Sequence, residues 1–285
     1  MNNDAPIPEH ILRRKGSPNT AGVPEEVRHF LNTGRIEAVN LSEWLVVDQG
    51  AIAAHCLPAL GLGQHVQAIT AALEALEALG KSTTPKRNAA VATALHTGLG
   101  STRAVERALK SLRQHPSDVI RSWACELVAA HAPWSLADKL DRIRPLAADT
   151  NMGVRECAWM AVCNDIAVQL EEALSRLVPF VLDPDPNIRR FATEATRPRG
   201  VWCRHIHALR EDPARGIILL EPVRADPSRY VQNSVANWLN DASKSQPDWV
   251  QDVCRRWQKE SPTAETAYIC RRALRTLTKS AKAKP

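Results

Sequence analysis

A five-residue frame, which reads aliphatic, Arg, any, any, Ala, recurs along this chain at a constant step. The clear copies lie at 120–124, 154–158 and 188–192, so both steps are 34 residues (154 − 120 and 188 − 154). Asp118, Asn151 and Asp185 precede the copies, and these residue types favour turns and helix caps. A fixed period in this range is typical of helical repeat arrays.

Looser copies of the frame at 231–235 and 269–273, and a weak one at 86–90, extend the array to roughly five or six helix pairs. Only 12 residues are glycine, and the 19 prolines fall mostly between apolar periodic segments. Residues 66–79 show the clearest amphipathic helix, with Gly80 at the expected C-terminal cap. The chain is therefore predicted to be all-α, a HEAT-like helical repeat solenoid.

The predicted organisation is a single array between two flexible ends. Residues 1–22 lack periodicity and carry Arg13, Arg14 and Lys15, so they are expected to form a flexible basic arm. Residues 23–278 form the repeat domain, and the lysine-rich residues 279–285 are expected to be a disordered tail. No apolar run long enough for a membrane span and no signal-peptide pattern is present, which predicts a cytoplasmic protein without membrane contact.

Seven cysteines, an odd number, fit buried thiols in a reducing compartment. Cys203 and His207 would share one helix face, but two ligands do not make a zinc site, so no metal and no cofactor is predicted. The chain lacks a His-Glu dipeptide, which argues against an iron-dependent helical repeat hydroxylase. It also lacks the Gly-x-Ser-x-Gly elbow of serine hydrolases.

The frame arginines Arg121, Arg155 and Arg189, with Arg190 beside the last, should align along one face when the repeats stack. Such a ribbon suits a phosphate backbone, because each contact releases counterions. Alternatively, these arginines bridge neighbouring helices to carboxylates such as Asp118, Asp149 and Asp185. The formal charge of +6 fits either interpretation.

Three motifs, at 189–202, 226–231 and 234–241, resemble the AlkC branch of the AlkC/AlkD HEAT-like DNA glycosylases. The resemblance covers about residues 118–260. It implies a C-shaped stack whose concave basic surface holds duplex DNA, and the removal of cationic alkylated bases such as N3-methyladenine without full base flipping. By the same resemblance, the site residues are Arg190, Glu194, Trp202 and Asp241.

These residue types suit the reaction that the resemblance implies. An N3- or N7-alkylated purine already carries positive charge and leaves as a neutral base, so positive charge develops on the sugar. A carboxylate stabilises that charge and orients water. A tryptophan face adds cation–π attraction, and an arginine holds the adjoining phosphate.

One position departs from the AlkC pattern, which has a further glutamate 35 residues before Glu194. That position is Trp159 here (194 − 35 = 159), and the nearest acid is Glu156. Glu156 substitutes for the missing acid, or Trp159 is a wall of a different lesion pocket, or the protein binds DNA without excising N3-methyladenine. The immunoglobulin-like module of some family members is also expected to be absent.

Each candidate also has a purely structural interpretation. Trp202 could plug a repeat junction, Glu194 could form an ion pair with its arginine neighbours, Asp241 could shape a turn, and Trp159 could belong to the core. The prediction is a monomeric, nucleoid-associated DNA alkylation repair glycosylase acting on duplex DNA; the alternative is a non-catalytic DNA-binding or protein-interaction scaffold. The predicted catalytic residues are Glu156, Trp159, Glu194, Trp202 and Asp241, and the predicted DNA contacts are Arg121, Arg155, Arg189, Arg190, Arg197, Arg199 and Arg229.

Overall fold

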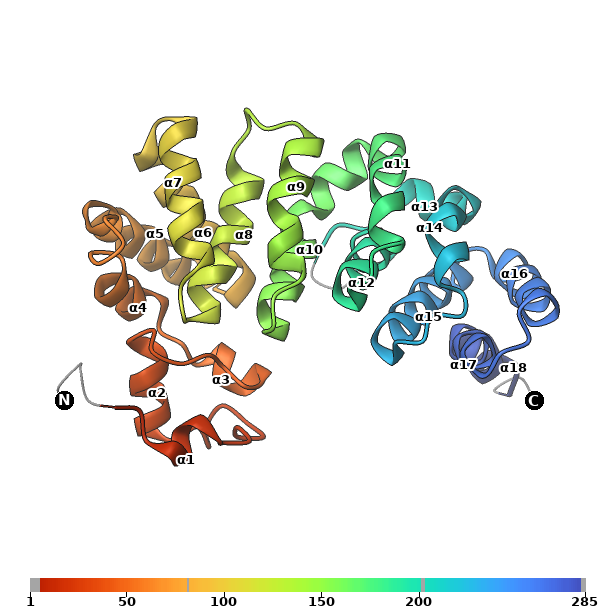
Figure 1. The fold of residues 1–285 in the computed structure, drawn as a ribbon, viewed down its shortest axis with the longest axis horizontal. Helices are drawn as coiled ribbons and strands as arrows, with labels where there is room; N and C mark the ends of the chain where they lie inside the picture. Colours follow the sequence, from red (N-terminus) through yellow and green to blue (C-terminus); the bar gives the residue numbers. More distant parts are fainter. Residues whose placement is uncertain (1–5, 81, 201–202, 283–285) are drawn as a thin grey trace. The chain divides into compact units, whose positions relative to one another are not determined.

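The computed structural model describes residues 6–80, 82–200 and 203–282, and within these ranges every regular element is a helix (Figure 1). The contacts divide the chain into two units. Unit 1 comprises residues 1–133 and 149–157, and unit 2 comprises residues 134–148 and 158–285. Helix α10 (Met152–Val168) contributes its first residues to unit 1 and the rest to unit 2. The predicted all-α fold is confirmed, whereas the sequence periodicity does not mark this division.

In unit 1, the helices pack largely on their neighbours in the sequence: α4 on α5, α5 on α6, and α7 on α8, while α6 also packs on α8. The described helices of unit 1 are α1 (Glu9–Leu12), α2 (Glu25–Asn32), α3 (Leu41–Leu45), α4 (Gln49–Cys56), η1 (Gly63–His65), α5 (Val66–Ala78), α6 (Thr84–Leu99), α7 (Thr102–Arg113) and α8 (Asp118–Ala130). The helix predicted at 66–79 corresponds to α5, and Gly80 follows it with a positive φ of 62°.

In unit 2, helix α15 packs on α12, α16 and α17, and α11 packs on α12 and α14. The described helices of unit 2 are α9 (Leu136–Ala147), α11 (Leu170–Val181), α12 (Pro186–Ala195), α13 (His207–Glu211), η2 (Pro213–Gly216), α14 (Ile217–Leu220), η3 (Glu221–Val223), α15 (Arg229–Ser243), α16 (Pro247–Glu260), α17 (Ala264–Ala273) and α18 (Arg275–Lys282), together with the later part of α10.

The repeated frame has a direct structural meaning. Its copies lie in α8, α10, α12, α15 and α17, and the aliphatic residue that opens each copy is buried. The fifth residue, alanine in four copies and Val235 in α15, is also buried, because residues four apart share one helix face. The frame therefore marks the core-facing stripe of one helix in each repeat, as the 34-residue period predicts.

The frame arginine ties its helix to the turn before it. The Nη1 atom of each donates to the two backbone carbonyl oxygens that lie six and five residues earlier. These contacts run from Arg121 to His115 and Pro116, from Arg155 to Asp149 and Thr150, and from Arg189 to Asp183 and Pro184, at 2.6 to 2.9 Å. In the looser copy, Gln232 takes the arginine's place and donates to the Asp226 carbonyl at 2.7 Å.

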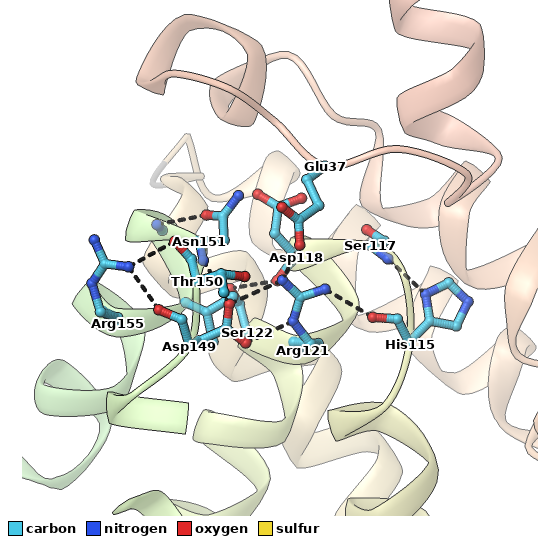
Figure 2. A network of polar contacts seen from close by, with 12 residues as sticks. Glu37, His115, Ser117, Asp118, Arg121, Ser122, Asp149, Thr150, Asn151 and Arg155 are labelled. Atoms are coloured by element: carbon cyan, nitrogen blue, oxygen red, sulfur yellow. Dashed lines mark hydrogen bonds and ion pairs between the residues drawn. The ribbon is translucent and has the colours of Figure 1, made fainter. Parts of the chain in front are cut away.

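Two frame arginines also reach forward to the aspartate that opens the next turn. Arg121 binds both oxygens of Asp149 through Nε (2.7 Å) and Nη2 (3.0 Å), as Figure 2 shows. Arg189 binds Asp226 in the same way, at 2.6 and 3.0 Å. We call this arrangement, an arginine joined to its own turn and to the next aspartate, the turn clamp.

The two ends differ from the sequence prediction. Within the predicted flexible arm, residues 9–12 form α1, Ile11 is buried, and Arg14 makes a bidentate ion pair with the buried Glu43 at 2.9 and 2.7 Å. Arg14 thus anchors residues that composition alone assigned to an arm. At the other end, α18 continues to Lys282, into the predicted tail. Residues 1–5 and 283–285 lie outside the described residues.

Candidate functional site

Helices α12 and α15 of unit 2 carry the two predicted carboxylates. Asp185 caps the start of α12 by accepting from the Asn187 amide at 2.8 Å, and Glu194 lies in the last turn of this helix. Asp241 lies near the end of α15. A hydrogen bond of 2.6 Å between Thr193 and Ser234 joins the two helices midway. Packing of α12 on α15 therefore sets the distance between the ends that carry the acids.

One arginine holds both acids. Arg197 donates from Nη1 to Glu194 Oε2 at 3.1 Å, and from Nε and Nη2 to Asp241 Oδ2 at 2.9 and 2.7 Å. Lys244 binds the other oxygen of Asp241 at 3.1 Å, and Arg190 lies 3.8 Å from Glu194. Glu194 is 4% exposed and Asp241 is 3% exposed. We call Arg190, Glu194, Arg197, Asp241 and Lys244 the carboxylate cluster.

The carboxylate cluster contains three cations and two acids, so it keeps a positive balance. Burial disfavours the charged form of Arg197, but Glu194 and Asp241 outweigh that effect and raise the pKa of its guanidinium. Close to the cluster, burial and the nearby Arg272 lower the pKa of Arg275, whose Nη2 donates to Asn237 at 3.0 Å. Such surroundings favour an additional anion.

Arginines and tyrosines extend from the carboxylate cluster along α15 and α17. The Arg190 guanidinium lies 4.2 Å from the Tyr230 ring centroid. Tyr268 donates to Asn233 at 2.8 Å, and three guanidinium groups surround its ring. We call this second group the tyrosine–arginine group: Tyr268 with Arg229, Arg271 and Arg272 at 3.6, 5.4 and 5.5 Å from the ring centroid.

Within the described part of the chain, the guanidinium groups of Arg229, Arg271 and Arg272 form no ion pair, and the buried Nε of Arg272 has no hydrogen-bond partner. Sequence reasoning missed Tyr268, Arg271 and Arg272. The available signal was the looser frame copy at 269–273, whose third and fourth residues are two adjacent arginines that were given no role.

The predicted DNA-binding arginines fall into two sets. All five N–H groups of Arg121 are engaged, since its Nη2 also binds Glu37 (Figure 2). Arg189 is held by its own turn clamp. These two arginines thus have the bridging role. Of the proposed acidic partners only Asp149 takes part, because Asp118 accepts from the Ala38 amide and Asp185 caps α12.

The remaining predicted arginines have different surroundings. Arg155 binds two carbonyl oxygens of its own turn, and Arg197 bridges the two acids. Arg199 donates to Ser245 at 2.7 Å. Arg190 and Arg229 stack on tyrosine rings, and Arg229 is exposed. Arg190, Arg199 and Arg229 therefore differ from Arg121 and Arg189 in that none of them forms a turn clamp.

The other candidates are placed as follows. Trp159 is buried in α10, and Glu156, one turn earlier, belongs to unit 1 rather than to the unit of Glu194. Burial of Trp159 corresponds to the core interpretation. Trp202 lies outside the described residues. Among the described residues, no group of three His, Cys, Asp or Glu side chains could hold a metal ion, and no helix is long and apolar enough to cross a bilayer.

Comparisons with known proteins agree with this architecture. No family model matches the chain. The uncharacterized protein YhaZ of Bacillus subtilis is 34% identical over 146 residues, which are 51% of this chain and 40% of that protein. The match thus spans well under half of YhaZ.

Solved structures share the fold at low sequence identity. The alkylpurine DNA glycosylase AlkC of Pseudomonas fluorescens, solved bound to DNA containing an abasic site analog, matches with a TM-score of 0.63 and 24% identity over 80% of this chain and 61% of AlkC. AlkD2 of Streptococcus mutans matches with a TM-score of 0.56 and 20% identity, over 72% of this chain and 97% of AlkD2. The resemblance inferred from the motifs is thereby confirmed at the level of the fold, and the chain has the helical-repeat architecture of AlkC and AlkD2.

Proposed function

We propose that this chain binds duplex DNA and removes cationic N3- or N7-alkylated bases by hydrolysing the N-glycosidic bond. The observation that carries the proposal is the carboxylate cluster, in which two buried acids from different helices meet at one guanidinium within a basic surrounding. The likeness to AlkC, a DNA-bound alkylpurine glycosylase, supports it. The protein would act as a monomer on nucleoid DNA in the cytoplasm.

The acids suit a reaction in which the sugar, not the base, gains positive charge. A cationic base departs as a neutral molecule, so it requires no proton from the protein. Glu194 and Asp241 then stabilise the oxocarbenium-like sugar, and the nearer one orients the attacking water. The attraction for the sugar cation comes from the two carboxylates themselves, and Arg197 pairs with both of them, so the site does not hold two unpaired anions in a buried position.

The tyrosine–arginine group supplies the phosphate contacts. Its three guanidinium groups repel one another, and a phosphate oxygen relieves that repulsion while accepting their hydrogen bonds. Arg190 and Arg199 lie closer to the two acids and would hold the phosphates that flank the damaged nucleotide. Arg121 and Arg189 take no part in this proposal.

This chain has Trp159 where the AlkC pattern has a glutamate, and this difference narrows the range of alkylated bases that we expect it to release. A buried indole stabilises a cation less directionally than a carboxylate does, so N3-methyladenine release should be weak compared with other alkylated bases. Glu156 is the acid nearest to Trp159 in the sequence, and it is retained here as the acid that could compensate. Glu156→Gln then abolishes release, whereas Trp159→Phe alters lesion preference.

A base-release assay on methylated duplex DNA tests the proposal. Glu194→Gln and Asp241→Asn should each lower the single-turnover rate by about a hundredfold, the usual effect of losing one positioned electrostatic group. Glu172→Gln, which removes an exposed acid paired with Arg176, is the matched control and should leave the rate unchanged. Full activity in both site variants would refute the site assignment.

The second candidate function is a non-catalytic scaffold that binds DNA or protein. It is favoured by the near-complete burial of both acids, which structural ion pairs share. The same assay separates the two functions. No release of any alkylated base by wild-type protein that binds DNA tightly would establish the scaffold.

A further inference from the structure

Unit 1 contains a cavity of about 340 Å³ that shares no residue with the carboxylate cluster. It lies where η1, the end of α6 and α7 meet, and α6 contacts both of the other two elements (Figure 1). Gly100, with a φ of 66°, ends α6, and Ser101 caps α7 by accepting from the Ala104 amide at 3.3 Å. The volume is within the range of about 300 to 1,000 Å³ that is usual for small-molecule sites.

Four polar side chains line the cavity, and among the described residues no acid does. We call these four, Gln64, His65, Arg107 and Ser111, the polar wall. His65 is 7% exposed, and its Nε2 lies 3.2 Å from the amide nitrogen of Gln64. The imidazole lies against the backbone of α6 at Gly98, where an added Cβ would collide with Nδ1 of His65. Packing and a hydrogen bond therefore hold part of the polar wall in place without a ligand.

Arg107 is the cation of the polar wall. Over residues 6–80, 82–200 and 203–282, its guanidinium group forms no ion pair and no hydrogen bond, and only its backbone carbonyl accepts, from Ser111 at 3.3 Å. Its helical neighbours three and four positions away are Arg103, Ala104, Lys110 and Ser111, so α7 offers it no acid. An exposed guanidinium in this situation can bind a carboxylate or a phosphate through two parallel hydrogen bonds.

The rest of the lining is largely apolar. Leu60 and Leu62 come from the turn that follows α4, Leu99 from the end of α6, and Ala104 and Ala108 from α7. An inorganic anion would use the polar wall alone and leave this apolar surface in water. A ligand that also carries an apolar body would remove that surface from water and so bind more tightly.

We propose that the cavity binds a small organic anion. A carboxylate or phosphate group of the ligand meets Arg107, the Gln64 amide and the Ser111 hydroxyl supply further hydrogen-bond donors, and the apolar body lies against Leu62, Leu99 and Ala108. The inference goes beyond the proposed base excision and does not depend on it. All lining residues belong to unit 1, whereas both acids of the carboxylate cluster belong to unit 2.

NMR titration of the full-length protein, without DNA, tests the inference. The probes are benzoate and phenyl phosphate, with benzamide as the uncharged analogue of benzoate and inorganic phosphate as the anion without an apolar body. At least one aromatic anion should shift the backbone amides of Gly98 and Leu99 in a saturable manner, and its rank against the other identifies the preferred head group. Benzamide and inorganic phosphate should each bind at least about tenfold more weakly, because each lacks one of the two contacts.

Three variants test the site itself. Arg107→Gln should weaken binding of the better aromatic anion by about tenfold to a hundredfold, the effect of losing hydrogen bonds to a charged group. Arg103→Gln is the matched control, since it removes the same charge from an exposed position one turn earlier on α7 that does not line the cavity. Ala104→Leu should fill the cavity and abolish binding without a change in charge, with thermal unfolding as the check on folding.

Three results would overturn the inference. The first is the lack of a saturable shift with either aromatic anion. The second is inorganic phosphate binding as tightly as both aromatic anions, which would mean an adventitious ion only. The third is an equal loss of affinity in Arg107→Gln and Arg103→Gln, which would mean that the probes respond to the general positive charge of α7.

Discussion

Asp118, in unit 1, is a carboxylic acid held where its charge is poorly compensated. It is 1% exposed, one oxygen accepts from the Ala38 amide at 3.2 Å, and the other has no hydrogen-bond partner among the described residues. Figure 2 shows it beside Glu37 and Arg121. Burial raises the pKa of Asp118 to about 7, with the Glu37 charge adding to the effect and Arg121 opposing it.

This shift predicts that Asp118 lowers stability as the pH rises. Between about pH 4 and 7 the unfolded chain has already lost the proton that the folded chain retains, so the free energy of unfolding falls with pH and then levels off. Asp118→Asn should remove this loss, which is at most about 4 kcal/mol for a shift of about three units. Urea unfolding of both proteins from pH 5 to 8 measures the difference.

Because Glu126 and His115 in the same unit also titrate abnormally, the difference between the two proteins is the informative quantity. A stability difference that does not change with pH would show that Asp118 is ionised throughout.

Arg197 is expected to matter more for folding than either acid that it binds. Arg197→Gln leaves Glu194 and Asp241 buried without their shared cation, which should destabilise the protein by about 3 to 5 kcal/mol. Glu194→Gln leaves Arg197 paired with Asp241 and should cost less. In the variant that combines Arg197→Gln with Glu194→Gln, the loss in free energy of unfolding should be smaller than the sum of the two single losses by about 0.5 to 3 kcal/mol. Urea unfolding measures all three losses. Strict additivity would mean that Arg197 and Glu194 do not interact in solution.

The sequence predicted which acids to examine but not how they are joined. Glu194 and Asp241 belong to motifs that are readable locally. Arg197 was assigned to DNA, because its contact with Asp241 crosses 44 residues and no local pattern encodes it. No local pattern encodes the surroundings of Tyr268 either, because its arginine neighbours come from two helices, α15 and α17.

At the scale of helices, the frame was predictable because one helix per repeat buries the same face. Where the spacing between the turn aspartates changes, the repeat pattern no longer predicts the helices. The turn aspartates Asp149 and Asp183 are 34 residues apart, but Asp226 follows after 43 (226 − 183). The short elements α13, η2, α14 and η3 lie before α15 in this longer interval, and they carry no repeated pattern. Helix α1 was missed because four residues are too few to show a period.

Gly216, in η2, sets the approach of that element to α15. An added Cβ would lie 2.5 Å from Cζ2 and 3.1 Å from Cη2 of Trp238, whose side chain is fully buried. Gly216→Ala should therefore destabilise the protein by about 1 to 3 kcal/mol, the usual cost of overpacking. Thermal unfolding provides the measurement. Gly50→Ala, in α4, is the matched control and should not destabilise, since its nearest neighbour would be 3.4 Å away. Equal effects of the two substitutions would contradict the packing argument.

For the molecule as a whole, the division of arginines predicts a specific response to salt. Affinity for undamaged duplex DNA should fall steeply as salt rises and depend little on sequence, because phosphates rather than base edges are bound. Arg229→Gln should weaken binding and reduce the slope of log affinity against log salt by about one, while stability stays near wild type.

Arg121→Gln is the matched comparison. It should lower the stability of unit 1, because it breaks five hydrogen bonds, and leave the salt slope unchanged. Fluorescence anisotropy at several salt concentrations measures the slopes. Binding that is insensitive to salt, or a slope that changes with Arg121 but not with Arg229, would reverse the two assignments.

The turn clamp has a consequence for how such a chain could lengthen in evolution. The segment that begins at Asp149 carries at its start the acid that Arg121 of the preceding segment binds. Six residues later it carries Arg155, which ties its own helix to that turn. Tandem duplication of that segment would give every new junction both an acid and a cation. The contact from Arg189 to Asp226 forms across the longer, 43-residue interval, so the clamp does not require the 34-residue spacing. Duplication boundaries in related genes should therefore fall at these turns rather than within the helices.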